Sequence, residues 1–225
     1  MAPMTLPLTH EILDATEHLP IGATLVVPQV SWDDYEILLE ELAERPHFRV
    51  SYDCGKLEIM SPSRDHEKYT RFFDDLVRAY ADAFDLELEK LGQTTWKLKA
   101  VGKGVEADDC YFVGNPERSM GRTTGDLEAD SPPDIAVEID ITRSSLRKFS
   151  IYAGLSIPEL WTYDGENVKF YKLFEGQYIP VPESRFLPKL TGTMLAESIN
   201  DSKARGQRTA LHAFRRRVQS LKRKG

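Results

Sequence analysis

The sequence has little cysteine and no long apolar segment. Cys54 and Cys110 are its two cysteines among 225 residues, too few for a disulfide framework or for a zinc site made of cysteine alone. We expect a buried, reduced pair, which fits a cytoplasmic protein. No apolar run reaches the roughly 18 residues that a membrane helix needs. The N-terminus lacks the basic and then apolar pattern of a secretory signal. The sequence therefore predicts a cytoplasmic protein with no membrane partner.

Several common catalytic and binding motifs are also missing. Gly102-Lys103-Gly104 lacks the spacing of a phosphate-binding loop and the Ser or Thr that should follow the lysine. No Ser-His-acid arrangement is legible, and neither cysteine has a His partner at a suitable spacing. No internal repeat or low-complexity tract is visible.

Charge is distributed unevenly along the chain. The formal net charge is −7, but residues 201–225 contain nine Lys and Arg against one acid, a net of +8 that leaves −15 for residues 1–200. Leu211, Phe214, Val218 and Leu221 recur at helical spacing among these basic residues, which predicts a basic amphipathic helix. An acidic body disfavours indiscriminate binding to nucleic acid, because phosphate contacts usually come from Lys and Arg.

Hydrophobic periodicity predicts helices that alternate with strands. We expect an irregular arm over residues 1–30, helices near residues 32–42, 65–84 and 144–153, and strands in the ranges 48–60, 86–91, 94–100, 107–113, 134–141, 160–163 and 168–173. The order favours an α+β or mixed α/β fold with a central sheet. We divide the chain into an N-terminal arm and helix (1–47), a core (48–185) and a C-terminal segment with the basic helix (186–225).

The strand at 134–141 carries acids on one face. Asp134, Glu138 and Asp140 alternate with apolar residues, so the face is either solvated, as on an edge strand, or a site for a divalent cation. Glu138 and Asp140 lie about 6.6 Å apart along a strand and can reach one ion, whereas Asp134 and Glu138 lie about 13 Å apart. We expect Asp134 to fix the strand start, and a further ligand to come from the strand that begins near residues 106–109.

Four segments resemble a known family in order and spacing. They are Gly55-Lys56-Leu57-Glu58-Ile59-Met60-Ser61-Pro62 followed by His66-Glu67; Glu106-Ala107-Asp108-Asp109-Cys110-Tyr111-Phe112; Ser131-Pro132-Pro133-Asp134-Ile135-Ala136-Val137-Glu138-Ile139-Asp140-Ile141-Thr142; and Lys148, Tyr152-Ala153 and Ile157-Pro158-Glu159-Leu160-Trp161. The chain thus resembles the Uma-two family of restriction endonucleases, within the PD-(D/E)XK nuclease superfamily. The resemblance implies a restriction-endonuclease-like central mixed sheet flanked by helices, here with an N-terminal strand and helix extension.

The resemblance also implies Mg²⁺-dependent hydrolysis of DNA phosphodiesters, with Mn²⁺ as a substitute. The superfamily's metal-binding Asp falls on Asp108, its Glu on Glu138, and its Lys on Lys148 of the following helix, because Asp140 stands where the motif has Lys. Ala107 replaces the motif's Pro, which leaves Asp109 as a rival to Asp108. Asp140 is either a third metal ligand, a residue that contacts a metal ligand without binding the metal, or an ion-pair partner of Lys148.

His66 and Glu67 begin the helix from which the superfamily takes a further acidic group. Glu67 has the expected chemistry, yet His66 lies on the apolar stripe, where a histidine is often a core or capping residue. Both stay candidates. The hypothesis is a homodimeric DNA endonuclease, and the rival is a catalytically silent nuclease fold that serves as a DNA- or protein-interaction module.

Overall fold

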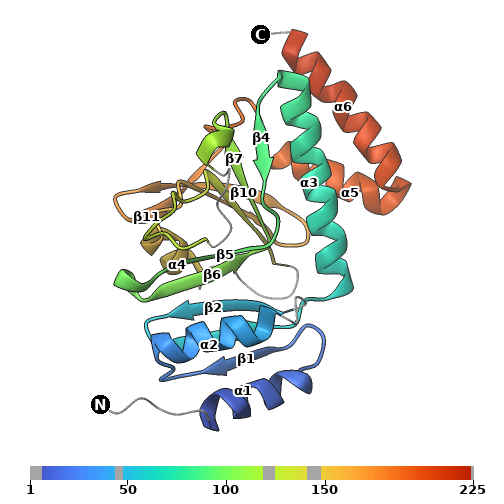
Figure 1. Ribbon diagram of the computed structural model, residues 1–225. Coiled ribbons are helices and arrows are strands. Elements are labelled where there is room, and N and C mark those ends of the chain that lie inside the picture. The colour runs from blue at the N-terminus through green and yellow to red at the C-terminus, as the bar shows by residue number, and fades with distance from the viewer. Residues whose placement is uncertain (1–6, 44–47, 119–124, 141–147, 224–225) are drawn as a thin grey trace.

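The computed structural model describes residues 7–43, 48–118, 125–140 and 148–223 (Figure 1). Two β-sheets and the helices that cover them make up this part of the chain. No helix within these ranges is both long enough and apolar enough to cross a membrane.

The first sheet contains the N-terminal strands. Its order is β1-β3-β2-β6-β5, and all neighbouring strands are antiparallel. The strands are β1 (Thr24–Val27), β2 (Arg49–Asp53), β3 (Lys56–Met60), β5 (Thr94–Leu98) and β6 (Lys103–Ala107). Alternation along β2 sends Val50 and Tyr52 into a core shared with helices α1 (Pro7–Glu17) and α2 (Trp32–Ala43). Arg49, Ser51 and Asp53 therefore share the other face of β2.

The second sheet is mixed and carries the acidic strand. Its order is β11-β10-β9-β8-β7-β4, and β8 pairs with β9 in parallel while the other pairs are antiparallel. The strands are β4 (Leu88–Lys90), β7 (Asp109–Val113), β8 (Ile135–Ile139), β9 (Glu159–Tyr163), β10 (Val168–Phe174) and β11 (Gln177–Val181). Because β8 is central and both of its faces are buried, the solvated outer face considered for the acids of 134–141 is wrong for Asp134 and Glu138.

The remaining helices are α3 (Arg64–Phe84), α4 (Phe149–Gly154), α5 (Gly192–Arg205) and α6 (Gln207–Arg223), with short 3₁₀ turns at Lys99–Val101 and Pro116–Arg118. In Figure 1, α3 runs along one side of the second sheet, and α6 lies outside α3. Apolar residues of these helices form one core with β8, including Phe73, Leu195 and Phe214. On the other face of the second sheet, α4 closes a smaller core that also contains Trp96 and Val105 of the first sheet.

Capping residues at both ends of helix α3 determine where it begins and ends. The hydroxyl of Ser63 accepts a hydrogen bond from the backbone N–H of His66, a standard N-terminal cap. Asp85 takes the left-handed conformation (φ 58°) that ends the helix. This cap fixes where the first turn of α3 starts, and so where His66 and Glu67 lie.

The predicted fold class is confirmed, with two corrections. The irregular arm expected over residues 1–30 is wrong for 7–17, which form α1, and for 24–27, which form β1 and pair with β3. The prediction of a buried cysteine pair is wrong for Cys54, which is exposed at the turn between β2 and β3, whereas Cys110 is buried. Neither cysteine forms a disulfide.

Candidate functional site

The pairing of β7 with β8 brings two acidic side chains together. Asp109 lies opposite Val137, and the backbone N–H of Asp108 donates to the Val137 carbonyl at 3.1 Å. The backbone N–H of Ile139 in turn donates to Oδ2 of Asp108 at 2.7 Å. Asp108 and Glu138 are each 3% exposed. An Asp from the segment 106–109 therefore comes to Glu138, as expected from the sequence.

Two side chains from the region of α4 bind Glu138. Nζ of Lys148, the residue immediately before α4, donates to Oε2 of Glu138 at 2.7 Å. The hydroxyl of Tyr152, one turn later, donates to Oε1. Both carboxylate oxygens of Glu138 are thus hydrogen-bonded, and the lysine that precedes α4 lies beside the acid that the resemblance assigned to it.

The first turn of α3 and strand β2 enclose Asp108. Nε2 of His66 lies 3.0 Å from Oδ2 of Asp108, and His66 is 4% exposed. Nδ1, on the other side of the ring, has no hydrogen-bond partner within the described residues. Arg49 donates from Nε to Oδ1 of Asp108 at 3.1 Å and from a terminal nitrogen to Oε1 of Glu67 at 2.7 Å. Arg49 therefore connects two of the predicted site residues.

Burial and charge act in opposite directions on these groups. Burial favours the neutral form of Asp108, but His66, Lys148 and Arg49 outweigh it and hold the pKa of Asp108 below its ordinary value. For Glu138, burial is the largest effect and raises the pKa, which Lys148 opposes and Asp108 reinforces. Burial lowers the pKa of Lys148, yet the carboxylates of Glu138 and Asp108 more than offset this and raise it. The cluster is a buried network of compensated charges.

The other acids considered in the sequence lie apart or have other partners. Asp109 accepts hydrogen bonds from the Tyr111 hydroxyl at 2.8 Å and from the backbone N–H of Cys110 at 2.9 Å. Asp134 binds Arg118 at 2.6 Å and the backbone N–H of Val113 at 2.9 Å, so it fixes the start of β8. Asp140 follows β8, is partly exposed, and donates its backbone N–H to Tyr163 at 2.7 Å.

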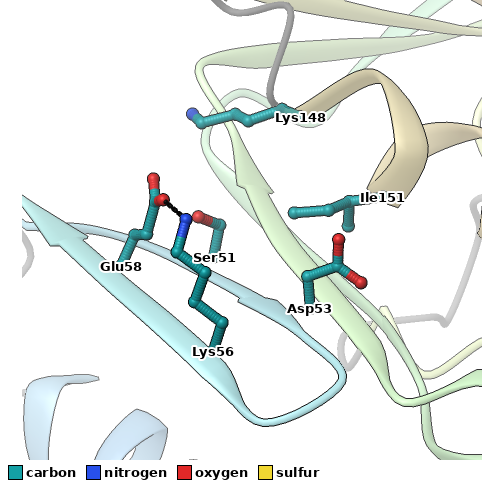
Figure 2. A pocket seen from close by; sticks show the side chains of 6 residues that line it. All are labelled: Ser51, Asp53, Lys56, Glu58, Lys148 and Ile151. Carbon is teal, nitrogen blue, oxygen red and sulfur yellow. Dashed lines mark hydrogen bonds and ion pairs between the residues drawn. The ribbon is translucent and has the colours of Figure 1, made fainter. Parts of the chain in front are cut away.

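A small cavity adjoins the cluster at Lys148. It has a volume of about 40 Å³ and is lined by Ser51, Asp53, Lys56, Glu58, Lys148 and Ile151. Figure 2 shows Lys148 across from the Lys56–Glu58 ion pair of β3, with Asp53 beneath Ile151 of α4. The cavity can take a few water molecules but not a nucleotide. A larger groove of about 880 Å³ lies at the α2 face of the first sheet and includes none of the predicted site residues.

Sequence reasoning missed two members of the cluster. Arg49 was not considered, although a charged residue between Phe48 and Val50 is unusual in a buried strand and is a usable signal. Tyr152 stands in one of the segments that resemble the family; packing on the sheet is the ordinary role of such a helix aromatic, but its spacing of four residues from Lys148 places both on one face of a helix. Within the described residues, no group of three His, Cys, Asp or Glu side chains is arranged to hold a metal ion.

The structure therefore defines a mixed α+β protein with a buried carboxylate–lysine centre on two neighbouring strands. A family model described as "Putative restriction endonuclease" matches residues 32–201, and the chain belongs to this family, Uma2. A crystal structure titled as a "putative nuclease belonging to DUF820" from Anabaena variabilis ATCC 29413 is similar, with a TM-score of 0.44 and 14% sequence identity over 63% of this chain and 85% of that one. No curated protein matches the chain.

Proposed function

We propose that this protein is a divalent-metal-dependent endonuclease that hydrolyses phosphodiester bonds of DNA. The observation that carries the proposal is the meeting of Asp108, Glu138 and Lys148. One buried carboxylate comes from β8 and the other from the residue just before the neighbouring strand β7, and the ammonium group of Lys148 lies 2.7 Å from the first. Membership of the Uma2 family supports a nuclease function in general.

The donor chemistry of the cluster suits Mg²⁺ or Mn²⁺. Carboxylate oxygens are the ligands that such hard cations prefer, and each oxygen that accepts one hydrogen bond keeps a further lone pair. Asp108 and Glu138 would hold the ion, with Asp140 as the candidate for a further ligand. When bound, the ion would polarise the scissile phosphate and make a water molecule more acidic.

The remaining side chains have roles that follow from their contacts. Lys148 is the cation nearest the carboxylates and would stabilise negative charge that develops on the phosphate. Tyr152 keeps Glu138 oriented, and Arg49 keeps Asp108 ionised and in place. His66 is the candidate for proton transfer beside Asp108, and Glu67, whose side chain is 43% exposed, is the candidate to meet solvent or substrate.

One observation favours the second candidate function, a catalytically silent nuclease fold that binds DNA or protein. All four carboxylate oxygens of Asp108 and Glu138 contact protein donors: Arg49, the Ile139 N–H, Lys148 and Tyr152. A charge network that is complete without metal would let the scaffold persist after loss of catalysis.

A plasmid-nicking assay separates the two functions. Supercoiled plasmid is incubated with the wild-type protein and Mg²⁺ or Mn²⁺, beside Glu138→Ala and a matched control, Glu87→Ala, which alters an exposed glutamate. The nuclease proposal expects metal-dependent nicking by wild type and control and none by Glu138→Ala. If the wild-type protein nicks with neither metal, the endonuclease proposal is wrong. Light scattering on the same samples tests the proposed homodimer, because cutting both strands favours two active sites.

A further inference from the structure

Helix α6 lies beyond the part of the chain that matches the family. The match ends at residue 201, and α6 spans Gln207–Arg223 without a single Asp or Glu. Its apolar side chains, Ala210, Phe214 and Val218, are buried in the core that α3 and α5 share. In Figure 1, α6 lies outside α3 and next to α5. The apolar face is therefore occupied within the chain, and the polar face is the one left for a partner.

Several cations near this face already have partners. Arg205 pairs with Asp201, Arg217 pairs with Glu197, and Nζ of Lys222 donates to the Ala83 carbonyl of α3 at 2.7 Å. The Arg205 pair lies within α5, whereas the contacts of Arg217 and Lys222 help to hold α6 against α5 and α3. They also use the acids of α5, so the remaining basic residues of α6 are not neutralised by it.

Four exposed arginines remain: Arg208, Arg215, Arg216 and Arg223. None of them has an ion-pair partner in the part of the chain that the structure describes. At 100° per residue they fall within an arc of about 100°, opposite the buried stripe, and they extend over about 22 Å of helix. We call this set the α6 arginine face.

We infer that the α6 arginine face binds the phosphate backbone of the nucleic acid that the protein acts on, an inference that rests on the proposed function. Guanidinium groups bind phosphate in a bidentate manner, and all four free cations are arginine. The arginines extend over about 22 Å, which matches about six base steps of DNA at about 3.4 Å each. A row of positive charges on α6 can therefore lie along a row of phosphates. The exposed stripe of α3 is a weaker candidate, because Asp75 and Asp82 alternate there with its cations.

Fluorescence anisotropy tests the inference without any cleavage step. The probe is a labelled DNA duplex of about 30 base pairs, and no divalent metal is added. The full-length wild type is compared with a variant in which the four arginines of the face become Gln, and with a control variant carrying Lys169→Gln, Lys172→Gln, Arg185→Gln and Lys189→Gln. The control removes the same charge from β10 and from the segment after β11. Circular dichroism verifies that both variants are folded.

Loss of the α6 arginine face should reduce the salt dependence of binding. The slope of log K against log salt is negative, and each lost phosphate contact reduces its magnitude by about 0.9. The magnitude of the slope, measured between ~50 and ~200 mM salt, should therefore be about 3 to 4 smaller in the α6 variant than in the wild type. Affinity at ~50 mM salt should fall at least about tenfold, while the control keeps the wild-type slope. An unchanged slope in the α6 variant, an equal loss in the control, or no binding by the wild type overturns the inference.

Two further results separate this inference from its alternatives. If light scattering shows that the α6 variant converts a wild-type dimer to a monomer, the face joins two copies of the chain, and the nucleic-acid inference is wrong. Binding that depends on the α6 arginines without nicking under any metal leaves the inference standing and refutes the endonuclease proposal. Nicking that depends on Glu138 but not on the α6 arginines, with equal DNA binding by the α6 variant, supports the endonuclease proposal and overturns the inference about the α6 arginine face.

Discussion

Arg49 and Asp108 lie 59 residues apart in sequence and form a buried ion pair, with Nε of Arg49 donating to Oδ1 of Asp108 at 3.1 Å. The pair connects strand β2 of the first sheet to the start of strand β7, which belongs to the second sheet. Arg49 also binds Glu67 at the N-terminal turn of α3. A single side chain therefore connects three elements at the candidate site, and its charge compensates a carboxylate that is 3% exposed.

Replacing Arg49 with Met should destabilise the protein strongly. Removing one partner leaves Asp108 buried with less compensation, and such losses cost about 3 kcal/mol or more. Urea unfolding of the single variants and of the double variant with Asp108→Asn measures the coupling. The loss from Arg49→Met should be much smaller in the Asp108→Asn background, and equal losses in both backgrounds would contradict the ion-pair explanation.

Replacing Tyr152 with Phe should shift the acidic limb of the activity profile. The hydroxyl of Tyr152 lowers the pKa of Glu138, which burial raises, so its removal raises that pKa further. A protonated Glu138 cannot hold a metal, and nicking should therefore decline at a higher pH in the variant than in the wild type. Rates across pH at saturating Mg²⁺ measure this. A profile that falls uniformly, with no displacement of the limb, would mean that Tyr152 acts through packing alone.

Replacing Ser63 with Ala should weaken the start of α3. The lost cap costs about 1 kcal/mol of stability. Because the same cap holds the N–H of His66, nicking should decrease more than stability alone explains. Ser63→Asp keeps an oxygen acceptor and serves as the control that retains both properties. Thermal unfolding and nicking rates of the two variants supply the comparison.

The sequence predicted the elements whose pattern is local. The broad apolar stripe of α3 and the strict alternation of 134–141 are strong signals; α3 forms with its stripe in the core, and β8 forms over Ile135–Ile139 with its apolar face in the same core. Strand β1 was missed because its four residues are stabilised by pairing with β3, 30 to 36 positions away, and not by their own pattern. Helix α1 was missed because a short segment with Pro and Thr gives weak periodicity.

The same distinction explains the candidate site. Glu138, Asp108 and Lys148 come together as the family motifs imply, since strand pairing and a short following helix fix their relative positions. Arg49 could not be placed, because its contact with Asp108 depends on how the two sheets meet. Asp108 and Asp109 could not be separated by sequence, because adjacent residues on a strand have opposite faces and either face was available.

Asp108 and Asp109 should respond in opposite ways to replacement by Asn. Burial, followed by the charge of Asp74, raises the pKa of Asp109 to about 7 from 3.8. A carboxyl whose folded pKa is raised destabilises the fold as pH rises from the unfolded value to the folded one, here between about 4 and 7. Asp109→Asn should therefore stabilise the protein at pH ~8, by up to about 3 kcal/mol, and little at pH ~4. The Asn amide can still pair with the Tyr111 hydroxyl.

Asp108→Asn should lower the stability of the fold, whereas Asp109→Asn should raise it. The pKa of Asp108 is held low by His66, Lys148 and Arg49, so loss of its charge leaves the cations Lys148 and Arg49 with less compensation and destabilises the fold at neutral pH. Nicking should disappear in Asp108→Asn and persist in Asp109→Asn, because the carboxylate of Asp109 is bound to Tyr111 and Cys110. Urea unfolding at pH ~4 and ~8, with nicking assays on both variants, tests the pair. Loss of nicking in Asp109→Asn alone would transfer the metal-binding role to Asp109.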